Sequence, residues 1–80
     1  MYYVTTGFYV SENSAEKVKE SVSNKIESST LFSNIDIIPS VLRLKNGVAV
    51  ILYESDCKEK AVEVKNILAT INVCCGVCVF

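Results

Sequence analysis

Histidine is absent from this 80-residue sequence, and its three glycines stand far apart at positions 7, 47 and 76. Without histidine, the usual general base and the usual activator of a nucleophile are both missing. Isolated glycines cannot form the glycine-rich loop that cradles a phosphate. Asp56 and Glu59 have the spacing of helix caps rather than of a catalytic pair of carboxylates. We therefore expect a protein that is not an enzyme and that needs no cofactor.

Long apolar runs and an excess of one charge are also missing. No window approaches the roughly 18 apolar residues of a membrane span, and the start, MYYVTTGFYV, lacks the positive region of a signal peptide. Eight Lys and Arg against nine Asp and Glu give a net charge of -1, spread along the chain. This balance favours neither nucleic acid nor an anionic membrane as a partner. We expect a cytoplasmic protein with a single domain over residues 1–80.

The first part of the chain changes from strand periodicity to helix periodicity. Residues 2–10 are rich in aromatic and β-branched side chains and predict a strand. Ser11 or Asn13 can cap a helix, and Asn13 with Glu16 has the spacing of a capping box. We predict a helix over about residues 13–28. Its apolar stripe consists of Ala15, Val18, Val22 and Ile26.

The middle of the chain predicts a β-hairpin. Two apolar runs, residues 35–45 and 48–54, are separated by Asn46-Gly47, a pair that tolerates the positive φ of a tight hairpin turn. Pro39 lies inside the first run. Because proline has no N–H to donate to a ladder, this strand should lie at an edge of the sheet and be bent or interrupted near Pro39.

The last part repeats the change from strand to helix and back to strand. Asp56 is the expected cap of a second helix, with Glu59 completing a capping box. An unbroken apolar run follows Asn72 and predicts a final strand. The buried stripe of the second helix should consist of Cys57, Ala61, Val64 and Leu68.

The predicted order is therefore β-α-β-β-α-β, which is typical of an α+β, ferredoxin-like sandwich. Right-handed crossovers place the first and third strands at the centre of a four-stranded antiparallel sheet, with the second and fourth strands at its edges. Both helices should cover one face and leave the other open. Many unrelated activities share this fold, so it does not identify a function.

Three of the four cysteines, Cys74, Cys75 and Cys78, lie in the final segment INVCCGVCVF. In a strand, Cys74 and Cys78 share one face while Cys75 points to the other, so the Cys75-to-Cys78 spacing does not bring two sulfurs together. We interpret these residues as small hydrophobic side chains of a strand, with no metal bound. A thiol or metal site formed by the three cysteines is the alternative.

The predicted third strand resembles a motif of the RNA-recognition domains of the RRM family. Residues 47–53, GVAVILY, follow the rhythm of that motif, and Tyr3 stands where the family has a base-stacking aromatic. The resemblance implies RNA binding on the open sheet face. However, Val48 and Val50 replace the two stacking aromatics, and Asn46 replaces a basic residue. A degenerate RNA binder is therefore an alternative, and nucleic acid is not the favoured partner.

Both faces of the third strand are apolar, so one apolar face should be left without helices. Val48, Val50 and Leu52 are expected on that face, with Ala49, Ile51 and Tyr53 toward the helices; the reversed arrangement exposes the second set instead. An uncovered apolar face predicts a homodimer, sheet against sheet. A different protein partner, or the C-terminal residues folded over the face, are the alternatives. The predicted contact residues are Tyr3, Tyr9, Val48, Val50, Leu52 and Phe80.

The sequence thus favours a small acidic protein-interaction or regulatory module that self-associates and binds or inhibits a larger protein. Its size and simplicity are those of many phage and mobile-element accessory proteins, including anti-defence inhibitors. The edge strand with Pro39 is a further candidate contact point. A regulatory domain of the ACT-like kind, which binds a small ligand between subunits, is an alternative, although SENS stands where a glycine-centred loop is expected.

Overall fold

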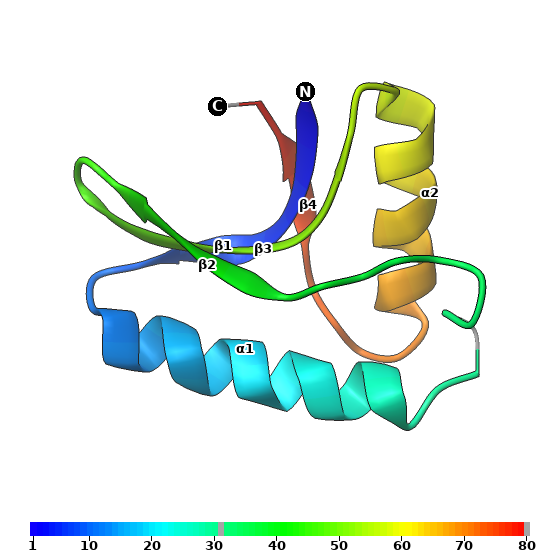
Figure 1. Cartoon of the computed structure of the whole chain (residues 1–80), viewed down its shortest axis with the longest axis horizontal. Helices are drawn as coiled ribbons and strands as arrows, with labels where there is room; N and C mark the ends of the chain where they lie inside the picture. Colours follow the sequence, from blue (N-terminus) through cyan, green and yellow to red (C-terminus); the bar gives the residue numbers. More distant parts are fainter. Residues whose placement is uncertain (31, 80) are drawn as a thin grey trace.

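Six elements follow one another in the predicted order β-α-β-β-α-β (Figure 1). The computed structural model describes residues 1–30 and 32–79. The four strands form one antiparallel sheet in the order β2-β3-β1-β4, which confirms the α+β class and the central place of the first and third strands and is consistent with a ferredoxin-like layout. The elements are β1 (Tyr2–Tyr9), α1 (Glu12–Glu27), β2 (Ser40–Leu44), β3 (Gly47–Ser55), α2 (Lys58–Ala69) and β4 (Gly76–Cys78).

The two central strands bend in the middle. The pairing of β1 with β3 shifts register between Val4 and Thr5 and again between Thr5 and Gly7. Such bulges bend a strand and increase its twist. The hydroxyl of Thr5 lies at this point, donating to the carbonyl of Val50 at 2.6 Å and accepting from the N–H of Gly7 at 3.2 Å. Figure 1 shows the consequence, a sheet that runs beside α1 and then turns to run beside α2.

The core lies between the helices and one face of the bent sheet. Both helices pack the apolar stripe that their periodicity predicts against the core, except for Cys57, which is half-buried and precedes α2. Both α1 and α2 pack against β1 and β3 on the same side. Burial of these aliphatic side chains is the main stabilising contribution. Among the described residues neither helix has the length and apolar character needed to cross a membrane. The core comprises Val4, Ala15, Val22, Phe32, Val48, Val50, Leu52, Ala61, Val64, Leu68 and Val73.

The two helix starts differ in how they are capped. The hydroxyl of Ser11 accepts a hydrogen bond from the N–H of Ser14 at 3.3 Å, so Ser11 is the cap and α1 begins one residue earlier than expected. At α2 the predicted cap, Asp56, is wrong. Cys57 occupies the cap position without a side-chain hydrogen bond, and its own N–H donates to the hydroxyl of Ser55 at 3.1 Å.

The hairpin between β2 and β3 turns at Lys45-Asn46, one residue before the predicted pair. Leu44 faces Gly47 as the first pair of the ladder, and neither turn residue has a positive φ. Gly47 is needed for a different reason: a Cβ there would stand 2.8 Å from the carbonyl oxygen of Tyr9. β2 is shorter than the predicted strand and begins at Ser40, directly after Pro39, at the edge of the sheet as expected.

Candidate functional site

The orientation of β3 decides which face of the sheet is open. Val48, Val50 and Leu52, which were expected on the open face, lie in the core with the helices, and Val50 and Leu52 are 0% and 1% exposed. They are therefore not available as a contact surface, and the reversed arrangement holds for Ala49 and Ile51. The branched side chains of Val48, Val50 and Leu52 fill the space between the sheet and the apolar stripes of the helices.

Tyr53 does not follow the reversed arrangement. The pairing of β3 with β1 passes from Tyr53 opposite Val4 to Ile51 opposite Thr5, so Leu52 is bulged. At a bulge, two consecutive residues can point to the same face, so the strict alternation of faces is interrupted. Accordingly Tyr53, like Leu52, packs against the core on the helix side.

The open face is the inner side of the bend, because both helices lie on the outer side (Figure 1). Ala49 stands between Phe8 and Leu42 in one row across the strands, and the next row joins Thr5, Ile51 and Ser40. Phe8 is 61% exposed and Leu42 is 37% exposed. Ala49 and Ile51 are buried beneath their neighbours and form the floor. The face therefore presents apolar side chains to solvent around a well-packed centre.

A third row crosses the open face and links Cys78, Tyr3 and Glu54. Of the described residues that were predicted as contacts, Tyr3 therefore lies on the open face. Tyr9 lies opposite Val48 on the helix side, with its hydroxyl 3.2 Å from the Oγ1 of Thr6. Phe80 lies outside the described residues. Phe8 and Leu42 were missed because their place follows from the bulges and the hairpin register, which alternation alone does not predict.

The orientation of Val48 and Val50 also distinguishes this sheet from the sheet of an RRM domain. These residues occupy the places of the stacking aromatics, yet both point into the core. Side chains that stack bases must lie on the open face. The similarity of residues 47–53 to that motif therefore does not extend to its orientation.

The thiols of the C-terminal cysteines do not converge. Cys78 lies in β4, whereas Cys74 and Cys75 precede it, so the interpretation of all three as strand residues is wrong. The thiol of Cys75 faces α2, where it approaches the carbonyl of Lys65 at 3.9 Å, whereas Cys78 lies on the open face beside Tyr3. Burial raises the pKa of both thiols, which lowers their thiolate fraction near neutral pH. Cys74 is exposed. In the part of the chain that the structure describes, no three Cys, Asp or Glu side chains are placed to hold a metal ion.

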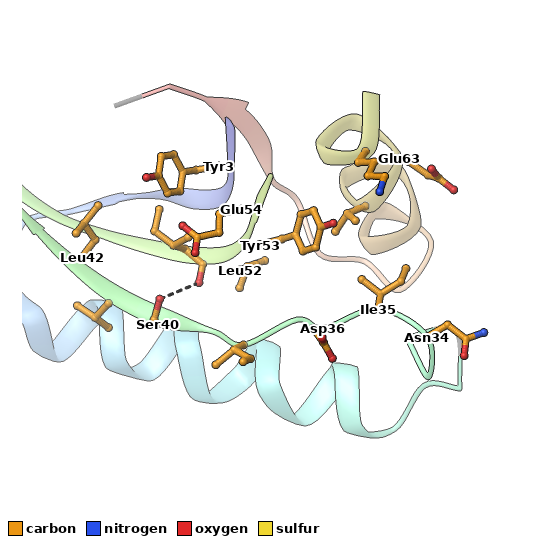
Figure 2. Close-up of a pocket in the computed structure, with 15 residues that line it drawn as sticks. Tyr3, Asn34, Ile35, Asp36, Ser40, Leu42, Leu52, Tyr53, Glu54 and Glu63 are labelled. Carbon is orange, nitrogen blue, oxygen red and sulfur yellow. Dashed lines mark hydrogen bonds between the residues drawn. The ribbon is translucent and has the colours of Figure 1, made fainter. Parts of the chain in front are cut away.

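A groove of about 940 Å³ opens beside β3 where β2 begins. Figure 2 shows its walls: Ile35 and Asp36 on the segment before β2, Tyr53 pointing from β3 toward α2, and Glu63 on α2. Ser40 marks its end, with a hydrogen bond of 3.5 Å from its hydroxyl to the carbonyl of Ile51. The sequence signal for this groove is Pro39, which predicts the interruption of the edge strand.

Comparison with protein-family models, with curated proteins and with solved structures found no match to this chain. The function is therefore inferred from the residues and the geometry alone.

Proposed function

We propose that this chain is a non-enzymatic protein-interaction module of the ferredoxin-like fold that forms a homodimer through the open faces of two sheets. The observation that carries the proposal is the exposure of Phe8 and Leu42 on a face without helices. A cluster of exposed apolar side chains on a small domain is typical of a contact surface. In a dimer the phenyl ring of Phe8 would be removed from water.

A second copy of the chain suits this face because the face carries little charge. Across its three rows, the charged residue is Glu54, at the margin beside Tyr3. In a twofold dimer each patch meets its own copy, so a charged centre would oppose like charges. The net charge of -1 also adds little long-range repulsion between two copies.

The dimer is proposed as a platform that binds or inhibits a larger protein. Its chemistry favours binding over catalysis, since histidine is absent and burial leaves Cys75 and Cys78 mainly protonated near neutral pH. The groove beside β3 reaches onto the open face, because Tyr3, Leu42 and Glu54 line it as well. Its other part, toward Asp36 and Glu63, lies away from the open face and is the surface on which a second protein can act in the dimer.

Sedimentation velocity over a concentration series, in a reducing buffer, tests the dimer. We expect the wild-type chain to sediment as a dimer and Phe8→Lys as a monomer, because the substitution places a charge within the contact. Val10→Lys is the matched control, because Val10 is 98% exposed and lies just beyond β1. A wild-type chain that stays monomeric, or a Phe8→Lys variant that is folded by circular dichroism and dimerises normally, would contradict the proposal.

A further inference from the structure

The end of β3 has a strand neighbour on one side only. β1 pairs with β3 as far as Tyr2 opposite Ser55, whereas the pairing with β2 ends at Ser40 opposite Ile51. Among the described residues, the stretch 52–55 therefore has no strand on its β2 side. Pro39 precedes β2 directly and has no N–H for a ladder, which explains why the pairing stops there. An edge of this kind can accept an additional strand.

The groove of about 940 Å³ lies along this same edge. Figure 2 shows it between residues 35–38 on one side and α2 on the other. The buried side chains of Leu52 and Val64 belong to its apolar lining. Ile38 is exposed at the rim. Its volume is at the upper end of the roughly 300–1,000 Å³ typical of ligand pockets. An apolar side chain entering the groove can therefore be buried against this apolar lining.

The polar lining of the groove is predominantly negative. Three carboxylates, those of Asp36, Glu54 and Glu63, line it together with one ammonium group, that of Lys60. The ion pairs found among the described residues, Glu16 with Lys19 and Glu12 with Arg43, involve none of these groups. The groove thus complements a positively charged occupant.

We infer that this groove binds an extended segment of a partner protein, added as a strand to β3, in which apolar residues alternate with Lys or Arg. In an added strand, successive side chains point to opposite faces. One set then meets Leu52 and Val64 on the helix side, and the other meets Glu54 on the open side. The inference deepens the interaction role proposed above and rests on it, but it does not depend on the dimer.

A selection from a random peptide display library, carried out against the wild-type chain in reducing buffer, tests this inference. We expect enriched peptides to alternate apolar and basic residues. Their affinity should fall about tenfold for Glu54→Lys, because Glu54 lies on the same side as the basic residues of the added strand. It should fall by less for Glu63→Lys, because Glu63 lies on α2, on the helix side, and acts through the negative charge of the groove as a whole. Glu20→Lys is the matched control, since Glu20 is an exposed carboxylate on α1, away from the groove, and its affinity should be unchanged.

The best selected peptide also tests strand addition directly. Methylation of alternate backbone nitrogens removes the donors that a ladder needs, so we expect binding to be lost with one methylation pattern and retained with the other. Amide shifts on binding should be confined to residues 52–55 and 35–38. The inference is overturned by the absence of any enriched peptide, by enriched peptides without basic residues, by equal effects of both methylation patterns, or by shifts on another surface.

The outcomes separate this inference from the proposed dimer. Phe8→Lys should keep peptide binding even as it removes the dimer. A wild-type dimer that binds no peptide would overturn the groove inference and leave the dimer standing. If Glu63→Lys, on α2 and away from the open face, instead abolishes self-association, the groove holds a second copy of this chain and the inference of a basic partner segment is wrong.

Discussion

The hydroxyl of Thr5 donates a hydrogen bond of 2.6 Å to the carbonyl oxygen of Val50 at the bend of the two central strands. The Oγ1 of Thr5 also accepts from the N–H of Gly7, so one side chain pairs two backbone groups where the ladder is irregular. We expect Thr5→Val to lower the free energy of unfolding by about 1–3 kcal/mol, because it keeps the shape and leaves both groups unpaired.

Urea unfolding monitored by circular dichroism measures this effect. Thr6→Val is the control, since the Oγ1 of Thr6 contacts the hydroxyl of Tyr9 and no backbone group of the bend. Thr6→Val should lower the free energy of unfolding by clearly less than Thr5→Val does. Equal costs for the two variants would show that the bend does not depend on Thr5.

The close approach of Gly47 to Tyr9 gives a second prediction. A Cβ at position 47 would lie 2.8 Å from the carbonyl oxygen of Tyr9, and backbone cannot move aside as a flexible side chain can. We expect Gly47→Ala to destabilise the protein by about 1–3 kcal/mol through this overlap. Gly76→Ala is the matched control, because nothing lies within 4 Å of a Cβ there. Thermal unfolding of both variants is the measurement, and a harmless Gly47→Ala would contradict the close packing of the hairpin on β1.

Much of the fold could be predicted because each element carries its own local signal. The apolar stripes of α1 and α2, the element order and the edge position of β2 all follow from periodicity and from Pro39. The hairpin turn was displaced by one residue, since Asn46-Gly47 suits a tight turn by itself and the contact of Gly47 with Tyr9 depends on tertiary structure. The final strand is restricted to Gly76–Cys78, although the apolar run is longer.

The caps of the two helices should differ in their energetic weight. The Oγ of Ser11 accepts from the N–H of Ser14, whereas Asp56 lies before the cap position of α2. We expect Ser11→Ala to lower the free energy of unfolding by about 1 kcal/mol and Asp56→Ala to have an effect within about 0.5 kcal/mol. Chemical denaturation of the two variants provides the comparison. A larger loss for Asp56→Ala would restore the capping role that the sequence predicts.

The stability of the protein should also depend on the Cys75 thiol at alkaline pH. Burial raises the pKa of Cys75 above its ordinary value of 9.0, so the unfolded chain loses this proton first as the pH rises. The stabilisation that the protonated Cys75 thiol gives to the folded state is fully present below the pKa of the unfolded chain and is lost as the pH rises through the pKa of the folded chain. The wild-type chain should therefore lose more stability than Cys75→Ala between about pH 8 and about pH 10.

Urea unfolding of both proteins at the two pH values, with a non-thiol reductant, measures this difference. Comparing the proteins at the same pH cancels the titration of tyrosine and lysine residues that they share. An equal loss of stability in the two proteins would contradict the burial of Cys75 against α2.

The contact face was harder to predict than the fold, because it depends on which of the two alternating sets of β3 side chains points away from the helices. A one-residue shift exchanges the two faces of a strand, and both faces of β3 are apolar. Hydrophobicity therefore did not distinguish Val50 from Ile51, and the bulge at Leu52 adds a local exception to strict alternation. Phe8 follows the bulges of β1, so its exposure becomes evident only once the register is known.

The most direct test of the proposed dimer is a dilution series of ¹⁵N-labelled protein, following each backbone amide by NMR in reducing buffer. We predict concentration-dependent shifts for Tyr3, Phe8, Leu42 and Ile51 on the open face, with the outer surfaces of α1 and α2 unchanged. Shifts confined to the helices, or no change over the accessible concentration range, would contradict self-association through the open face.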